Sequence, residues 1–321
     1  MLLPVSVAAQ QKHSFFYKVD SLLTIHMRAK GDTNYVTRPN KRLTFRILNN
    51  VSGTSFVMRG TDSEYIKMKV YFKDPLRYTI TLSANYRGLA VSFAFNPAHL
   101  MGKKTSTEFN INSYGNHYGF DFLYEKNGEY DVSFKKGDDH FYSPNSNITE
   151  KSMTINGYYA INGDKFSYPA AFSQSYIQKK SAGSLMIGGS YHRSTIGFNT
   201  GENDDIDYEA VNKLKMSYAG IGLGYGYNYV PSTNWLIHAS VLPSLVLWNE
   251  SKIVYYGYVK RVDAHFPEYS MVARGAVIHY FKSFFTGLTM VYNYSSAGDM
   301  DKLRLDHNKW RARFILGMRF W

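Results

Sequence analysis

The chain of 321 residues contains no cysteine. Disulfides, thiolate metal sites and lipid attachment through an N-terminal cysteine are therefore excluded. Outside residues 2–9, no apolar run approaches the roughly 20 residues of a membrane-spanning helix. The HExxH, GxSxG, Walker and glycine-rich dinucleotide motifs are also missing, so we predict no cofactor, no metal site and no enzymatic activity.

Acidic residues are outnumbered by basic ones, and the formal net charge is +12. The lysines and arginines are scattered along the chain without a nucleic-acid recognition motif, so we expect no nucleic-acid partner. A basic surface that faces acidic lipopolysaccharide or the periplasm is the simpler interpretation.

Aromatic residues are abundant, at 17% of the chain. In residues 309–321 one face is entirely apolar, and the other is largely charged or small. A period of two predicts a β-strand, because successive side chains of a strand point to opposite faces. Tilted by about 40°, this strand would rise about 25 Å, the height of the apolar band of an outer-membrane barrel. The apolar face consists of Trp310, Ala312, Phe314, Leu316, Met318 and Phe320.

The same alternation begins at Arg77 and continues to the C-terminus. It predicts an all-β, transmembrane, antiparallel up-and-down barrel of about 12 strands (roughly 10–14) over residues 77–321. Residues 10–76 lack sustained alternation, and we expect an irregular periplasmic or lumen-inserted segment with short strands. Residues 1–9 resemble the end of a signal peptide. Short links at 230–234 and 281–283 predict a periplasmic C-terminus, because the long links then lie outside the cell.

The tryptophans lie at the ends of predicted strands. Indole rings prefer the headgroup level of a membrane, so this placement predicts two aromatic girdles. A soluble periplasmic β-protein that carries lipid in its interior is the alternative, with these rings in its core. The expected interface residues are Trp235, Trp248, Trp310, Phe320 and Trp321.

Two segments are too particular for a generic barrel sequence: KFSYPAAFSQ at 165–174 and QKKSAGS at 178–184. Together with ANYRGLAVSF at 84–93, they resemble a Bacteroidota family catalogued as domain of unknown function 4421. The resemblance covers about residue 35 to the C-terminus. It implies an outer-membrane β-barrel and implies no activity.

Charged residues gather on the face opposite the apolar one, which would line the lumen. In an open lumen such charges would form a transverse field that orients polar solutes. In a narrow lumen they would neutralise one another as a hydrogen-bonded plug. Since a barrel of this size falls between filled and open ones, we favour an occluded lumen. The predicted lumen charges are Arg77, Arg87, Glu108, Asp121, Glu129, Asp131, Arg274, Arg311, Arg313 and Arg319.

Three local features carry further expectations. Inward glycines at 220, 222, 224 and 226 accommodate either a folded-in element, such as residues 162–180, or strong strand curvature. Pro243 cannot donate to a ladder and predicts a bulge or kink. The acidic segment 202–209 offers oxygen ligands for Ca²⁺ but lacks the spacing of a calcium loop, so a solvated loop is favoured.

His238 and Ser240 share the inward face of one predicted strand, an arrangement that hydrolases use. No orienting carboxylate is identifiable, so a structural pair is favoured. We predict a non-enzymatic outer-membrane barrel, either a narrow pore for small polar solutes or a barrel subunit of an envelope assembly. An outer-membrane hydrolase acting through His238 and Ser240 is the alternative. The expected partners are outer-membrane lipid, lipopolysaccharide and other envelope proteins.

Overall fold

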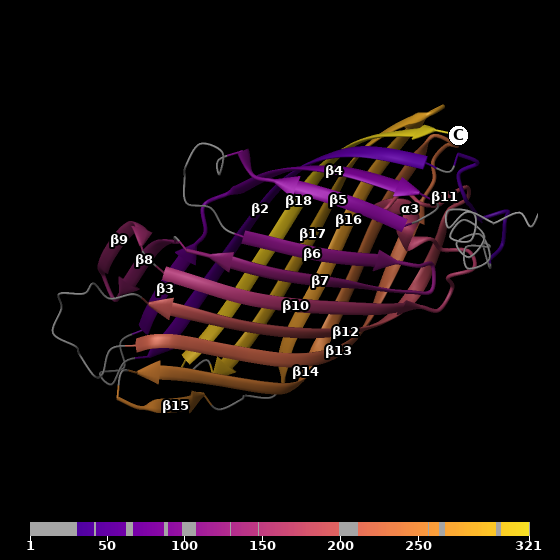
Figure 1. The fold of residues 1–321 in the computed structure, drawn as a ribbon. Coiled ribbons are helices and arrows are strands. Elements are labelled where there is room, and N and C mark those ends of the chain that lie inside the picture. Colours follow the sequence, from indigo (N-terminus) through magenta and orange to yellow (C-terminus); the bar gives the residue numbers. More distant parts are fainter. Residues whose placement is uncertain are drawn as a thin grey trace, which may run out of the picture.

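The computed structural model describes residues 31–41, 43–61, 67–86, 89–97, 107–128, 130–146, 148–198, 211–255, 257–262, 267–299 and 303–320. Most of them lie in antiparallel strands of one curled sheet (Figure 1). No helix in this part of the chain is long and apolar enough to cross a membrane. The signal-peptide remainder expected at 1–9 lies outside the described residues.

Long strands form the curved wall of the molecule. From β10 onward, successive wall strands along the chain are neighbours in the sheet, as an up-and-down arrangement requires. The wall strands are β2 (Leu43–Thr61), β4 (Arg77–Tyr86), β5 (Leu89–Phe95), β6 (Thr107–Tyr114), β7 (Tyr118–Asn127), β10 (Ile148–Ala160), β12 (Ala182–Phe198), β13 (Val211–Tyr229), β14 (Trp235–Tyr255), β16 (Glu268–Phe281), β17 (Phe284–Asp299) and β18 (Leu303–Phe320).

The first and last wall strands pair with each other. Leu43 of β2 lies opposite Phe320 of β18, and Gly60 lies opposite Leu303. β4 and β5 follow β2 in the sheet, whereas β6 and β7 lead toward β10 from the other side. Within the described ranges no pairing joins β5 to β6, so these two strands are the edges of the curled sheet.

The free side of β2 is divided between two partners. Residues 43–52 pair with β4, and residues 55–61 pair with β3 (Lys67–Lys73). β3 carries β8 (Tyr130–Lys136) and β9 (Asp139–Ser146) in a side sheet, while β7 pairs directly with β10. The expected barrel boundary at residue 77 is therefore too late, and the strand expected in the wall at 130–134 belongs to the side sheet. The alternation of β2 is hidden in the sequence because Leu48 and Phe56 are apolar on its buried face.

Three short strands and one helix complete the described structure. β1 (Val36–Thr37) and β11 (Ile177–Gln178) form a separate pair, and β15 (Val259–Val262) pairs with β14. The helix α3 (Tyr168–Phe172) lies in the link between β10 and β12.

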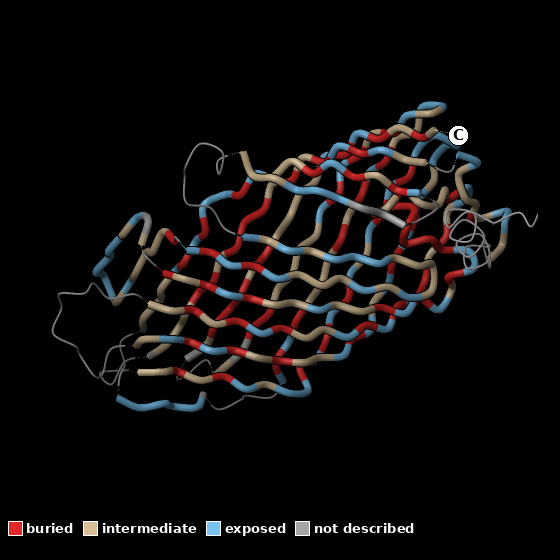
Figure 2. The backbone as a smooth tube through the Cα atoms, viewed as in Figure 1, coloured by how far each residue is buried: buried red, intermediate tan, exposed pale blue. Residues whose placement is uncertain are grey.

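Burial alternates along the wall strands (Figure 2). On β4, Arg77, Thr81 and Ser83 are buried, whereas Leu82 is 49% exposed. Phe314 on β18 is 44% exposed in the same way. The apolar face of the alternating segments is therefore the outer face of the wall, as the sequence predicts.

The interior contains two apolar layers. One lies toward the end of the wall where β18 finishes, which we call the C-terminal end, and it includes α3. The other lies toward the far end and is built around Phe56, Phe72 and Tyr130. The rings of Phe56 and Phe72 stack with centroids 4.3 Å apart. The side chains of these two layers occupy the inner side of the curled sheet toward both of its ends.

The pairing of β13 with β14 contains a bulge, but not at the position expected. The register shifts between Ala219 and Gly220, where Leu247 of β14 is the extra residue, and it is unchanged across Pro243. A Cβ added at Gly222 or Gly224 would come within 2.2 Å of a backbone oxygen of β14. These glycines therefore permit close strand coiling, one of the two explanations offered by the sequence.

Candidate functional site

The link between β10 and β12 folds into the C-terminal end of the lumen, and we call residues 162–180 the plug segment. Ser167 caps α3 by accepting a hydrogen bond from the Ala170 amide at 3.3 Å, and Pro169 occupies the first turn, where no amide donor is needed. Every residue of α3 is buried. A Cβ at Gly226 would meet Phe166, so this glycine makes room for the plug, the other explanation that the sequence offered.

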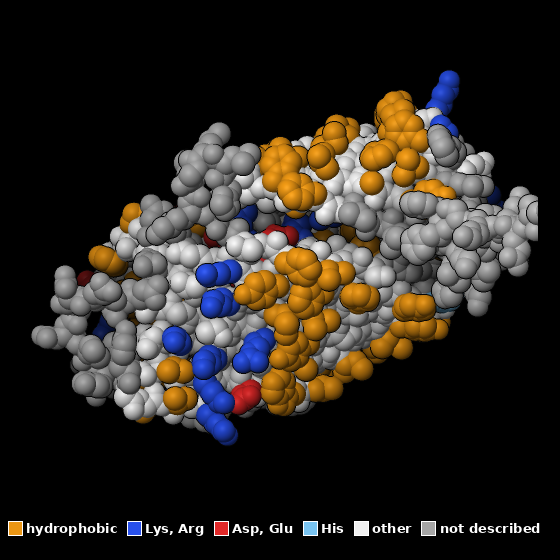
Figure 3. All heavy atoms as spheres, viewed as in Figure 1, with side chains coloured by type: hydrophobic (Ala, Val, Ile, Leu, Met, Phe, Trp, Pro, Cys, Tyr) orange, Lys and Arg blue, Asp and Glu red, His pale blue; other side chains and the backbone are white. Residues whose placement is uncertain are grey.

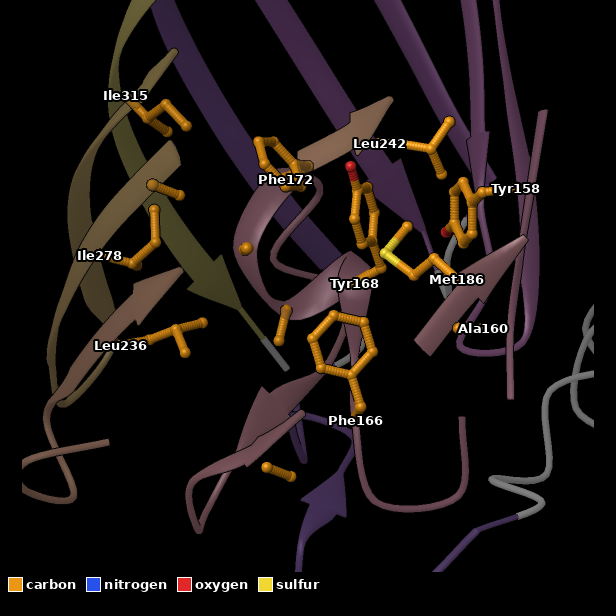
Figure 4. Close-up of a cluster of buried hydrophobic side chains, with 14 of the residues drawn as sticks. Tyr158, Ala160, Phe166, Tyr168, Phe172, Met186, Leu236, Leu242, Ile278 and Ile315 are labelled. Atoms are coloured by element: carbon orange, nitrogen blue, oxygen red, sulfur yellow. The ribbon is translucent and has the colours of Figure 1, made fainter. Parts of the chain in front are cut away.

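Side chains of the plug segment fit between two parts of the wall (Figure 4). Phe166, Tyr168 and Phe172 lie in the middle of the cluster. The close-up places Tyr158, Met186 and Leu242 on one side and Leu236, Ile278 and Ile315 on the other.

Two arginines of the wall hold the C-terminal end of α3. Arg46 of β2 donates to the Ser173 carbonyl at 2.9 Å and to Ser83 at 3.0 Å. Arg319 of β18 donates to the Gln174 carbonyl at 3.1 Å. Cations suit this position, because the carbonyls at the end of a helix lack partners. Arg319 was predicted to face the lumen, and Arg46 was missed.

A chain of hydrogen bonds joins the plug segment to β13 and β14. The Gln178 amide oxygen accepts from Asn228 at 2.8 Å, and His238 Nδ1 donates to Asn228 Oδ1 at 2.7 Å. Because an amide oxygen only accepts, the proton lies on Nδ1, and His238 Nε2 accepts from Ser240 at 3.0 Å. The predicted pair is thus real, and its orienting group is an amide.

The space beside Ser240 is small. A cavity of about 20 Å³ is lined by Ser240, Tyr168 and Arg274 among others, which is room for one or two water molecules. His238 is enclosed by the rings of Phe166, Tyr168 and Phe172, with centroids 5.1–5.9 Å away. This geometry suits an anchor for the plug segment better than a site that admits a substrate.

A layer of ion pairs lies above the plug, in the middle of the lumen. Glu125 of β7 accepts from Arg77 of β4 at 2.9 Å and also contacts Lys309 of β18. Its side chain is only 1% exposed. Arg77 lies on β4 and Lys309 on β18, and neither strand pairs with β7, so these contacts bridge strands that are not neighbours in the sheet.

The other predicted charges of this layer are also paired or hydrogen-bonded. Arg311 contacts Glu108, and Arg274 contacts Asp121, again between distant strands. Arg313 donates to the Asn50 side chain at 2.6 Å. A cavity of about 70 Å³, with room for a few water molecules, lies among these groups. Of the two arrangements predicted for the lumen charges, the described residues form the neutralised one.

One acidic group of this region lies outside the wall strands. Asp74, in the link between β3 and β4, is buried and lies 3.1 Å from Arg77. Burial raises the pKa of Asp74 to about 6, because loss of hydration outweighs the opposing effect of the Arg77 charge.

Polar groups also lie beneath the apolar layer of the far end. Glu150 is 1% exposed and is contacted by Tyr130, by Asn127 at 3.3 Å and by His307 at 3.5 Å. The ring of His307 lies 5.1 Å from that of His192. No group of three or more metal-binding side chains forms within the described ranges.

Several predicted residues take other places. Asp131 lies on β8 in the side sheet, not in the wall. Arg87, Glu129 and the acidic segment 202–209 lie outside the described residues. The sequence leaves open which face of its strand carries Arg274. In the structure this side chain is 8% exposed and faces inward.

The expected interface aromatics are mostly on the outer face. Trp235 is 41% exposed near the C-terminal end, and Trp248 is 46% exposed toward the far end. Phe320 packs edge-on against Phe45, with centroids 5.8 Å apart. Trp310 is partly buried beside Gly53. The remaining expected interface residue, Trp321, lies outside the described part of the chain.

A family described as a domain of unknown function (DUF4421) matches residues 30–320. The chain belongs to this family. The match confirms the family resemblance of the plug segment and of β4–β5, which both lie within it. None of the curated proteins matches the sequence.

Solved structures with some likeness to the chain are outer-membrane proteins. The outer membrane protease OmpT from Escherichia coli is 9% identical, with a TM-score of 0.45 over 88% of this chain and 98% of its own. The translocator domain of the autotransporter NalP from Neisseria meningitidis is 11% identical, with a TM-score of 0.36 over 98% of this chain and 100% of its own. At these identities and TM-scores the likeness transfers no activity to this chain.

Proposed function

We propose that the protein is a transmembrane β-barrel of a Gram-negative outer membrane, with its C-terminus in the periplasm. The proposal is supported by the outer face of the wall, where large apolar side chains are exposed on strand after strand. Leu223 is 71% exposed, Phe93 69% and Leu288 54%. A soluble lipid carrier would bury these side chains, whereas a lipid bilayer covers them.

We further propose that the barrel closes through β5 and β6, giving twelve strands. Unpaired backbone groups at a sheet edge are very costly in hydrocarbon, so an open seam would not persist in a membrane. The ion pairs from Arg77 and Arg311 to Glu125 and Glu108 support closure, because they link the two sides of the seam through the lumen.

The role supported best is that of a non-enzymatic barrel subunit of an envelope assembly, with a lumen that does not conduct. The observation that carries this role is the filled lumen: two apolar layers, one of them containing the plug segment, enclose a layer of paired charges. A narrow pore would require both apolar layers to move. A hydrolase would require space for a substrate beside Ser240, where the cavity of about 20 Å³ has room for only one or two water molecules.

Planar-bilayer recording tests this role. The full-length protein, inserted into a bilayer, should produce no stepwise conductance at moderate voltage. Steady single-channel steps would contradict the proposal and favour the pore. Release of fatty acid or peptide fragments by the wild type, absent in His238→Ala, would instead favour the hydrolase.

A further inference from the structure

A row of basic side chains crosses the outer face of the wall near its far end. In the register of the sheet, Lys126 of β7 lies opposite Lys151 of β10, and Lys215 of β13 lies opposite Lys252 of β14. Lys252 in turn lies opposite Arg261 of β15. With Arg193 of β12, these residues form what we call the basic patch: Lys126, Lys151, Arg193, Lys215, Lys252 and Arg261.

The patch is exposed and continuous. Its members are exposed or, for Lys252, half-buried, and only Thr195 interrupts the row, between Lys151 and Lys215. Figure 3 shows Lys and Arg side chains gathered on the face formed by β7 to β14, beside a band of hydrophobic side chains. The row therefore forms one surface.

The charges of the patch are not balanced within the described chain. Like charges directly opposite each other in a sheet are destabilising, and the row contains three such pairs. Among the described residues, Glu250 is the acidic side chain in ion-pair contact with the patch, at 2.5 Å from Lys252. An anionic partner would remove this repulsion.

Aromatic side chains border the patch on the side of the apolar band. Tyr124 precedes Lys126 by two positions on the same face of β7, and Tyr191 precedes Arg193 likewise on β12. Tyr191 stacks on Trp248 with centroids 6.5 Å apart. Such rings mark the headgroup level of a membrane, which places the patch at the level of the lipid phosphates.

We propose that the basic patch binds the headgroup of a membrane lipid that carries two or more phosphates. The inference rests on the proposed membrane insertion and names a lipid partner for it. The row spans five strand spacings of about 4.8 Å, or about 24 Å, which is wider than one phosphate. Lysine and arginine both pair well with phosphate oxygens. An acidic protein or a nucleic acid would not need the aromatic and apolar border.

A lipid-binding titration tests the proposal. Full-length protein in neutral detergent is titrated with diphosphorylated lipid A and with its monophosphorylated form, and bound lipid is counted by native mass spectrometry. The triple variant Lys126→Gln, Lys151→Gln, Lys215→Gln should bind the diphosphorylated lipid at least about tenfold more weakly, since each lysine at an anionic surface contributes roughly fivefold. The matched control removes three exposed lysines elsewhere: Lys135→Gln, Lys165→Gln, Lys282→Gln.

The outcomes distinguish a failure of the lipid site from a failure of membrane insertion. Support requires tighter binding of the diphosphorylated lipid, loss in the patch variant, retention in the control and weakening by salt. Equal binding of both lipids, an unchanged patch variant, or equally tight binding of an acidic peptide or DNA would overturn the proposal. If the wild type enters bilayers but shows no preference, only the lipid site fails. If it does not enter bilayers, the proposed membrane role fails as well.

Discussion

The buried carboxylate of Glu125 on β7 connects strands that lie apart in the sheet. It reaches Arg77 on β4 and Lys309 on β18, and neither strand is its neighbour in the sheet. A buried ion pair stabilises a fold less than its Coulomb energy suggests, because both groups lose hydration. Removal of one partner is nevertheless costly, since a charge then stays buried without its full counter-charge.

Replacement of Glu125 should therefore destabilise the protein strongly. Glu125→Gln removes the carboxylate that contacts Lys309 and one of those that contact Arg77, which keeps Asp74 at 3.1 Å. We expect the free energy of unfolding in urea and detergent micelles to fall by about 3–5 kcal/mol. Lys309→Met added to this variant should restore part of the loss, because it removes one unpaired charge. Asp164→Asn, at a side chain that is 65% exposed, should stay within about 0.5 kcal/mol of wild type. An unchanged Glu125→Gln protein would refute a role for ion pairing in filling the lumen.

The sequence predicts most of this charged layer but not its centre. Arg77, Glu108, Asp121 and Arg311 face inward because their strands alternate cleanly. Glu125 directly follows Tyr124 and lies on the opposite, inward face, so it would be identified if the predicted strand were extended by one residue. Contacts across the lumen could not be derived, because they depend on how tightly the sheet curls.

At the scale of the element, the plug segment is a loop fastened at several points. Arg46 and Arg319 hold its helix end, and Gln178 reaches Asn228 in the wall. From the sequence, residues 162–180 are expected only as an element that could fold in against the inward glycines. Ser167 followed by Pro169 is a helix-start signal that indicates α3. Its path into the lumen is set by tertiary packing, which a local pattern does not encode.

Loss of the two fastening arginines should loosen the plug segment. In the double variant Arg46→Ala, Arg319→Ala, the carbonyls of Ser173 and Gln174 lose charged donors, which contribute roughly 1.5–3 kcal/mol each. We expect amide hydrogen exchange in residues 165–180 to accelerate about tenfold or more, measured by mass spectrometry of that peptide. Arg193→Ala, on the outer face, is the control and should leave this peptide unchanged. Equal protection in the double variant would mean that apolar packing alone retains the plug.

At the scale of the whole molecule, the outer surface decides which solvent the protein occupies. The alternation of the sequence predicts this surface well, because each side chain's face follows from its position in a strand. The pairing of β2 with β18 was not predicted, because the buried face of β2 mixes Leu48 and Phe56 with polar residues. The pairing of β18 with a strand before residue 77 depends on how the whole sheet curls, so no local stretch of sequence reveals it.

A charged side chain on the apolar outer face of the wall should lower the stability of the protein only in a bilayer. Leu223 is 71% exposed on β13, and Leu223→Arg should lower stability in phospholipid vesicles by about 2–4 kcal/mol, measured by urea titration of tryptophan fluorescence. Val259 is 58% exposed on β15, outside the wall, and Val259→Arg should have little effect. If both arginines are tolerated equally, lipid does not cover the band and the membrane assignment is wrong.

The neighbouring positions of β2 and β18 have a consequence for biogenesis. The ladder that joins them pairs Leu43 with Phe320 and Gly60 with Leu303, so it cannot form until the last strand has emerged from the ribosome and left the cytoplasm. Ladders between residues so distant in the chain form slowly, because a large loop must first be ordered. Until then, the unpaired strands would expose their apolar faces. Maturation of the chain would therefore depend on chaperones that prevent aggregation until β2 and β18 can pair.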